Sequence, residues 1–294
     1  MPRKRNKHHK KLSAIRLFIS VLCIISIVLI AENQISRYHL DKYIPHSLKE
    51  IVGHKDNQSA KPIDDRIDNI EIPARLYDRE EQIIRHTGYT VSYNEELRLP
   101  NWVAYELTRE KTNGTFNRTN RFIPDPQVNG ICPSTQDYSN SGYDRGHMAP
   151  AADMKWNVKA MKESFYLSNI CPQLHNLNAG DWKELEEKVR KWAQKDSLIF
   201  IVCGPIVKKS PKRIGINKVA VPNAFFKVIL SPSGKFPKAI GFMMEHKKGN
   251  QPLRSYAISV DSIESVTGID FFPALPDDIE QKIEKEFSTK QWGI

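Results

Sequence analysis

The chain has 294 residues, a formal net charge of +10 and an isoelectric point near 9.3. Such a charge invites a nucleic-acid partner. Seven of these positive charges, however, precede Ile30 with no acid among them, which leaves a net charge of only +3 for the rest. Total charge is therefore weak evidence for a nucleic-acid partner, and the absence of internal repeats excludes a repeat architecture.

The first 31 residues combine a basic start with an apolar run. Residues 17–31 are apolar apart from Ser20 and Ser26, and the cations lie in residues 1–16. This order is typical of a secretory signal peptide or an uncleaved signal anchor. Because no clean small-x-small cleavage site closes the run, we favour a single-pass membrane anchor over a cleaved signal. The remainder is then extracytoplasmic, either anchored to the membrane or secreted.

Two further regions follow the apolar run. Residues 32–71 are polar and show little helical or strand periodicity, which indicates a linker. Residues 72–294 are patterned as a folded domain, long enough for one substantial hydrophobic core. The predicted organisation is therefore a signal anchor in 1–31, a polar linker in 32–71 and a single domain in 72–294.

The domain mixes strands with helices. Enrichment in β-branched, aromatic or other apolar residues predicts strands at 90–93, 101–108, 164–170, 197–202, 220–221, 224–230, 239–244 and 256–260. Helical spacing and capping residues predict helices at 153–161, 179–194 and 276–287, with a loop at 171–177. Few strict βαβ units occur, so we expect an α+β fold, or a mixed α/β/α layered domain.

Tyr143–Pro150 is the stretch that most indicates chemistry. His147 can exchange a proton near neutral pH, and Arg145 carries a permanent charge in a planar fork that suits phosphate oxygens. Gly146 allows backbone angles that a side chain would forbid, and the preceding run 139–142 has turn chemistry. The grouping predicts action on a phosphate ester, with His147 as base and Arg145 as charge stabiliser. A surface pair or a core histidine is the plainer interpretation of the same residues.

The helix predicted at 179–194 offers a second set of polar groups. Asn178, Trp182 and Glu186 form an i,i+4 row, so the carboxamide and the carboxylate can face a shared cation or phosphate. Helix capping by Asn178 and solvent exposure of Glu186 explain the same pattern without a ligand. Upstream, Arg118 and Arg121 lie in a loop before Pro124, where they are either solvated charges or ligand contacts.

Three cysteines, Cys132, Cys171 and Cys203, lie in the predicted domain. In an oxidising compartment an odd number allows at most one bridge among them, and the sequence does not say which. They lack the close C-x-x-C spacing of a zinc site, so we do not expect zinc.

Taken together, four blocks resemble one known family. They are Asp144-Arg145-Gly146-His147-Met148-Ala149-Pro150, Leu-Ser-Asn-Ile-Cys-Pro-Gln around Asn169, Leu-Asn-Ala-Gly-Asp-Trp around Asn178, and Glu-Leu-Glu ending at Glu186. In this order and spacing they are similar to the DNA/RNA non-specific endonuclease family, and the resemblance spans roughly residues 72–287. It implies a ββα-metal catalytic core, in which a strand with the histidine, a second strand and a helix surround one metal ion.

The resemblance also implies roles for individual residues. His147 would be the general base, Asn178 the protein ligand of one Mg²⁺ ion, and Glu186 the group that orders metal-bound water. Asn169 and Arg145 would support the site. The family has an upstream arginine that contacts the scissile phosphate. Arg118 and Arg121 are both candidates for this arginine, which would bind the substrate and take part in catalysis.

We therefore expect an endonuclease that hydrolyses phosphodiester bonds of DNA and RNA with Mg²⁺, or alternatively Mn²⁺. Its expected partners are these nucleic acids, the membrane through the N-terminal segment and, as an open alternative to a monomer, a second copy in a homodimer. Two rival functions are a non-catalytic nucleic-acid-binding module of the same fold and a phosphodiesterase acting on small or lipid substrates.

Overall fold

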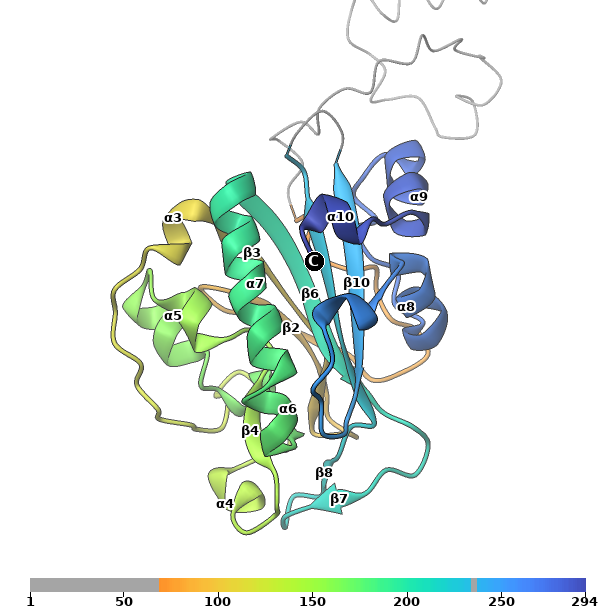
Figure 1. Ribbon diagram of the computed structural model, residues 1–294. Coiled ribbons are helices and arrows are strands. Elements are labelled where there is room, and N and C mark those ends of the chain that lie inside the picture. Colours follow the sequence, from red (N-terminus) through yellow and green to blue (C-terminus); the bar gives the residue numbers. More distant parts are fainter. Residues whose placement is uncertain (1–68, 234–236) are drawn as a thin grey trace, which may run out of the picture. The chain divides into compact units, whose positions relative to one another are not determined.

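An antiparallel seven-stranded sheet runs through the part of the chain that the computed structural model describes, residues 69–233 and 237–294 (Figure 1). Its strand order is β1-β2-β3-β6-β9-β10-β11. The strands are β1 Gln82–Arg85, β2 Thr90–Asn94, β3 Leu99–Thr108, β6 Leu198–Ile206, β9 Ala224–Ser231, β10 Lys238–Glu245 and β11 Ala257–Ile258. The centre of the sheet is almost fully buried, because β3, β6 and β9 are apolar on both faces.

Shorter elements surround this sheet. Two small two-stranded sheets pair β4 Asp144–His147 with β5 Ile170–Gln173, and β7 Arg213–Ile214 with β8 Val219–Ala220. The helices are α3 Arg109–Thr112, α4 Thr135–Tyr138, α5 Val158–Glu163, α6 His175–Asn178, α7 Asp181–Asp196, α8 Val260–Thr267, α9 Asp277–Lys285 and α10 Thr289–Trp292. Single 3-10 turns occupy Ala151–Met154, Leu167–Asn169 and Leu253–Ser255.

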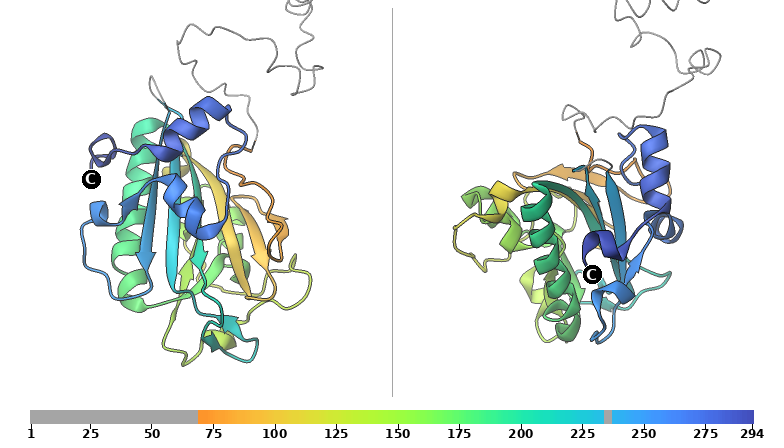
Figure 2. Two further views of the ribbon diagram at one scale, coloured as in Figure 1. Left: turned by 90° about the vertical axis from the view of Figure 1, so that its right-hand side faces the viewer. Right: turned by 45° about the horizontal axis from the view of Figure 1, so that its top comes forward.

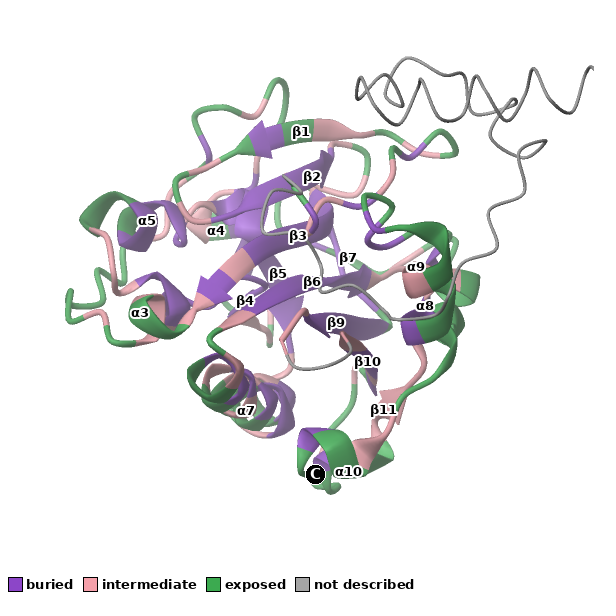
Figure 3. Cartoon of the chain, turned by 90° about the horizontal axis from the view of Figure 1, so that it is seen from above, coloured by how far each residue is buried: buried purple, intermediate pink, exposed green. Residues whose placement is uncertain are grey.

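The sheet separates two hydrophobic cores, and helices cover both faces (Figure 2). On one face, α7 packs Trp182, Leu185 and Val189 against inward residues of β3, β6 and β9. On the other, α8 and α9 contribute Ile263 and Ile283 to a core with the opposite sides of the same strands. Viewed from above, buried strands lie between α7 and the α8–α9 pair (Figure 3). The fold is thus a mixed α/β domain with a large antiparallel sheet.

Most predicted elements appear within two residues of their expected bounds. The amphipathic helix 179–194 is α7, and the strands at 90–93, 101–108, 224–230 and 239–244 are β2, β3, β9 and β10. Residues 256–260 hold only the two-residue strand β11, which is followed directly by the unpredicted helix α8. The helix predicted at 153–161 is wrong, because a 3-10 turn precedes α5 and Asn157, not Asp153, caps it.

The region 164–177 was predicted incorrectly. Its apolar start, expected as a strand, ends in the 3-10 turn Leu167–Asn169, and the strand β5 and helix α6 occupy the expected loop. β5 pairs with β4 in a two-stranded sheet, in which His147 lies opposite Ile170. A short apolar run does not by itself distinguish a strand from a buried turn.

Cys132, Cys171 and Cys203 are free thiols in this fold. The predicted anchor in residues 1–31, and the linker up to residue 68, lie outside the described residues. Among the residues that are described, no helix is long and apolar enough to cross a membrane.

Candidate active site

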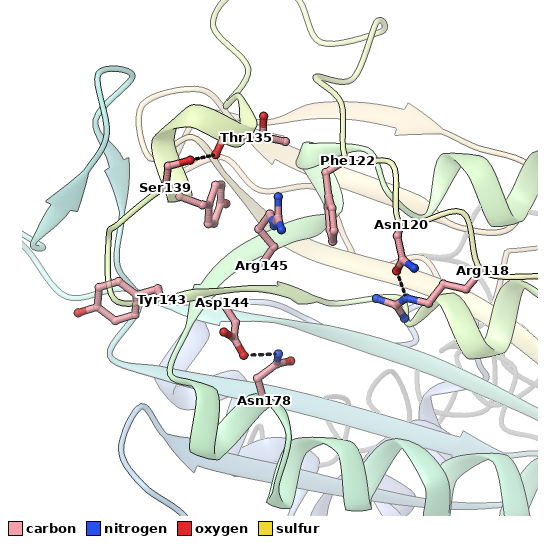
Figure 4. A pocket seen from close by; sticks show the side chains of 10 residues that line it. Arg118, Asn120, Phe122, Thr135, Ser139, Tyr143, Asp144, Arg145 and Asn178 are labelled. Atoms are coloured by element: carbon pink, nitrogen blue, oxygen red, sulfur yellow. Dashed lines mark hydrogen bonds between the residues drawn. The ribbon is translucent and has the colours of Figure 1, made fainter.

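A pocket of about 390 Å³ gathers side chains from four separate stretches of the chain (Figure 4). It is lined by Arg118, Asn120, Phe122, Thr135, Tyr138, Ser139, Tyr143, Asp144, Arg145 and Asn178. Three residues predicted from the sequence, Arg118, Arg145 and Asn178, therefore share one space. Two guanidinium groups beside one pocket suit an anionic ligand such as a phosphate.

Strand β4 carries Arg145 and His147, which project from the same face because side chains alternate along a strand. Gly146 lies between them, and its φ is not in the positive range. The prediction that this glycine serves through unusual backbone angles is therefore wrong. A glycine fits this position because a side chain would collide with β5. A Cβ atom at Gly146 would lie 2.1 Å from Oε1 of Gln173.

The surroundings of His147 keep its imidazole neutral. The residue is 8% exposed, and its ring centroid lies 5.0 Å from that of Phe165 and 5.4 Å from that of Phe122. Burial, together with the charges of Arg118 and Arg145, lowers the pKa of His147 to about 3. Nε2 is enclosed without a hydrogen-bond partner, so Nδ1 is the nitrogen through which the ring meets solvent. At neutral pH the ring can thus accept a proton.

Asn178 is the last residue of α6, and a neighbouring carboxylate orients its side chain. Nδ2 of Asn178 donates to Oδ2 of Asp144 over 2.9 Å, and Nδ1 of His175 lies 2.9 Å from the same oxygen (Figure 4). Because the amide nitrogen is engaged, the amide oxygen is left to bind a cation. The predicted position of Asn178 at the start of the long helix is wrong, since α7 begins at Asp181 after Gly180.

Glu186 on α7 lies among charged side chains rather than in the pocket lining. Burial raises its pKa to about 7, and the nearby Asp153 adds repulsion. Lys227, Arg190 and Arg118 act in the opposite direction and favour the carboxylate. Arg190 also binds Asp153 directly, with Nη1 2.8 Å from Oδ1. Near neutral pH Glu186 is therefore divided between its acid and its carboxylate form.

Lys227 is a member of this network that the sequence interpretation missed. It is fully buried on β9, and its Nζ has no hydrogen-bond partner but lies 4.6 Å from the ring centroid of Trp182. Trp182 in turn donates from Nε1 to the backbone oxygen of His147 over 3.3 Å. The signal was present, because Lys227 is the only charged residue in the apolar run 224–230.

Asn169 holds the backbone that follows His147. Its Oδ1 accepts from the Ala149 amide, and its Nδ2 donates to the carbonyl oxygens of Ala149 and Ser164, each over 2.9 Å. The side chain is completely buried, with both amide groups engaged. Asn169 therefore acts on the site by fixing the end of β4, consistent with a positioning role.

The structure distinguishes the two upstream arginines. Arg118 lines the pocket, donates from Nε to Oδ1 of Asn120 over 2.6 Å, and lies with Cζ 5.0 Å from the Phe165 ring centroid. Both residues are exposed, but Arg121 does not line the pocket. Arg118 is thus the better candidate for a substrate contact, a choice that depends on loop geometry rather than on sequence.

The sequence of residues 68–278 matches the DNA/RNA non-specific endonuclease family. Because the match covers well over half of the chain, this protein belongs to that family, as its motifs predicted.

Named relatives agree with this assignment. The chain is 40% identical over 214 residues to the Danio rerio protein "Nuclease EXOG, mitochondrial", covering 65% of this chain and 60% of the relative. It is 32% identical over 207 residues to human "Endonuclease G, mitochondrial", covering 65% and 70%. A solved structure of an EndoG/EndoGI complex superimposes with a TM-score of 0.64 at 28% identity, covering 69% of this chain and 90% of that one. The chain thus spans about three fifths of the length of the EXOG relatives.

Proposed function

We propose that this protein is a metal-dependent endonuclease that hydrolyses phosphodiester bonds of DNA and RNA without regard to sequence. The observation that carries the proposal is the pocket in which Arg118, Arg145 and Asn178 meet. His147 does not line this pocket, but its neutral imidazole lies behind Phe122, which does, with ring centroids 5.4 Å apart. In this proposal β4, β5 and the consecutive helices α6 and α7 form the ββα-metal core, since β4 carries the proposed base, α6 carries Asn178 and α7 carries Glu186.

His147 would accept the proton of the attacking water. A positioned base typically accelerates such a step about 10²- to 10⁴-fold. The low pKa of the free imidazole makes it a weak base before substrate arrives. A phosphate bound by Arg118 and Arg145 would offset the two positive charges that help to lower this pKa. We therefore infer that substrate binding itself raises the basicity of His147.

The two arginines would stabilise negative charge on the phosphate. Each guanidinium lies over an aromatic ring, with Cζ of Arg145 4.4 Å from the Phe122 centroid and Cζ of Arg118 5.0 Å from the Phe165 centroid. Stacking restricts both groups before substrate binds, so less ordering is needed in the transition state. Contacts to phosphate carry no direct sequence information, which supports a non-specific nuclease.

The donor atoms around Asn178 fit a hard divalent cation. The free amide oxygen of Asn178 and the carboxylate of Asp144 are oxygen donors of the kind that Mg²⁺ prefers, and Mn²⁺ is the alternative. Such an ion would supply neutralisation of the phosphate charge. Glu186, in its carboxylate form, would orient water on the α7 side of the site.

Cleavage assays with the purified protein test the proposal. We expect plasmid DNA and RNA to be degraded with Mg²⁺ or Mn²⁺ and to remain intact with excess EDTA. Undiminished cleavage in chelator would remove the metal from the proposal. Binding of nucleic acid without cleavage would favour the non-catalytic module, and turnover of a small chromogenic diester alone would favour a small-substrate phosphodiesterase.

Location and assembly are separate proposals. The anchor predicted in residues 1–31 places the enzyme outside the cytoplasm, whereas the names of several relatives place those proteins in mitochondria. Fractionation of cells that express the full chain with a C-terminal tag would distinguish a membrane pellet, a secreted form and a mitochondrial form. Light scattering of the purified protein would test the homodimer.

A further inference from the structure

Helices α8 and α9, on the sheet face opposite α7, bring carboxylates close together. Asp261 and Glu264 lie one turn apart on α8, and Glu284 lies on α9. One carboxylate oxygen from each of the three lies within 4.8 Å of the others. Acidic side chains this close repel one another, so their convergence needs a counter-charge or a proton.

Glu284 is the unusual member of this cluster. It is 6% exposed, and its Oε1 is enclosed with no hydrogen-bond partner. Buried polar atoms are almost always paired, because an unpaired one loses its hydration without replacement. A neighbouring acid shows the same feature, since Oε1 of Glu280 is also enclosed and unpartnered. Two glutamates of α9 thus each carry an unsatisfied oxygen, whereas Glu264 on α8 already accepts from the Phe271 amide over 2.8 Å.

We propose that Asp261, Glu264 and Glu284 bind a divalent cation, with Ca²⁺ as the best-fitting ion. All donors are oxygens, which hard cations prefer over nitrogen- or sulfur-binding metals. Ca²⁺ binds oxygens at about 2.3–2.6 Å, so two of its ligands can be up to about 5 Å apart. Three oxygens within 4.8 Å of one another can share one such ion, whereas Mg²⁺ demands near-ideal octahedral geometry and gives up its waters reluctantly.

The electrostatics of the cluster agree with a missing positive charge. Burial, and then the carboxyls of Glu264, Glu280, Asp270 and Asp261, raise the pKa of Glu284 to about 9. A divalent ion beside Glu284 would offset these like charges and satisfy the enclosed oxygen.

The proposed site is distinct from the nuclease pocket. It joins α8 to α9 across the core that contains Ile263 and Ile283, on the far face of the sheet from α7 (Figure 2). Glu284 also lies beyond residue 278, where the family match ends. We therefore expect the ion to stabilise the C-terminal helices of this chain without taking part in phosphodiester cleavage.

Calcium titration of the full-length Asn178→Ala variant tests the proposal, because that background removes one of the two oxygen donors proposed for the catalytic ion. We expect calorimetry on the chelator-treated protein to show one Ca²⁺ bound per chain, with a rise in melting temperature. Both effects should be lost in Asn178→Ala/Glu284→Gln. The control Asn178→Ala/Glu286→Gln removes an exposed acid beyond the same helix and should bind Ca²⁺ normally.

Three outcomes would overturn the proposal. Absence of Ca²⁺ binding up to about millimolar concentration, or binding unchanged by Glu284→Gln, would each do so. A third outcome is a parent protein whose melting temperature does not respond to Ca²⁺, together with a Glu284→Gln variant that melts at a higher temperature in chelator. It would show that the cluster holds only a proton. If Glu284→Gln does not fold, Ca²⁺ binding is measured with Asp261→Asn instead, because Asp261 is exposed. This variant must also lose Ca²⁺ binding if the proposal is correct. The proposal does not depend on nuclease activity and survives its failure.

Discussion

Two glutamates on opposite faces of the central sheet have opposite surroundings. Burial raises the pKa of Glu186, on the α7 face, to about 7. Lys227 and Arg190 oppose this rise, because their positive charges favour the carboxylate. Glu284, on the α8–α9 face, has a pKa raised to about 9, because burial is reinforced by other carboxyls. The first face places cations beside its glutamate, whereas carboxyls dominate the surroundings of Glu284.

The difference separates activity from stability. A carboxyl that titrates near neutral pH beside a phosphate-binding pocket can take part in proton and water chemistry. A carboxyl held neutral in an acidic cluster contributes mainly to the pH dependence and ion dependence of folding. Substitutions on the α7 face should therefore change cleavage, and substitutions on the α8–α9 face should change melting.

The largest expected effect is that of His147→Ala. Loss of the proposed base should lower the rate of plasmid cleavage about 10²- to 10⁴-fold, with nucleic-acid affinity and melting temperature largely retained. Plasmid relaxation under Mg²⁺ and a gel-shift assay in chelator measure the two properties. Cleavage at the wild-type rate would break the assignment of chemistry to this face.

Arg118→Ala and Arg121→Ala form a matched pair that removes equal charge from one loop. Only Arg118 lines the pocket, so we expect its loss to lower kcat/KM about 10- to 100-fold, the cost of a charge-assisted hydrogen bond. Arg121→Ala should remain within about twofold of the wild type. Equal losses in steady-state cleavage of a labelled oligonucleotide would show that the loop acts through overall charge.

Lys227→Met should shift the pH dependence of cleavage. Lys227 favours the ionised form of Glu186, so its removal raises the pKa of that carboxyl above its present value of about 7. If Glu186 acts as a carboxylate, activity is lost as pH falls through this pKa, and the acid limb should move to higher pH by about one unit. Lys191→Met, on the exposed side of α7, is the control and should leave the profile unchanged.

Glu284→Gln should have the smallest effect, confined to stability. The folded pKa of about 9 exceeds the ordinary value of 4.5, so in chelator the folded state loses stability as pH rises between these values. A glutamine side chain cannot ionise, so the Glu284→Gln variant avoids this loss of folding stability. The melting temperature of the variant should match the wild type near about pH 4 and exceed it increasingly towards about pH 9. A parallel cleavage assay should show no change, and a loss of activity would contradict the separation of the two faces.

The sequence predicted the regular parts of the fold and three of the residues that line the pocket, Arg118, Arg145 and Asn178. Helix α7 was recognisable because Trp182, Leu185, Val189 and Trp192 repeat on one face, and the central strands because they are apolar throughout. The motif around His147 and the residues Asn178 and Glu186 were identified without coordinates. Their roles in cleavage stay predictions.

Features that depend on tertiary contacts were not predictable in the same way. The segment 164–177 was misassigned because hydrogen bonds from Asn169 to the backbone of Ala149 and Ser164 hold it in a turn. The choice of Arg118 over Arg121 required the path of a loop. The pairing of Glu284 with α8 required two helices, one of them unpredicted, to meet across the core.

The buried thiol of Cys203 bears on where this domain can mature. Its Sγ donates to the carbonyl oxygen of Met148 over 3.2 Å, and burial raises its pKa to about 11. Burial likewise raises the pKa of Cys132 to about 12 and that of Cys171 well above its ordinary value. Thiolates, the species that attack disulfides and oxidants, are therefore scarce at neutral pH. Once folded, the domain should therefore keep these thiols reduced both beside a glutathione pool and outside the cell.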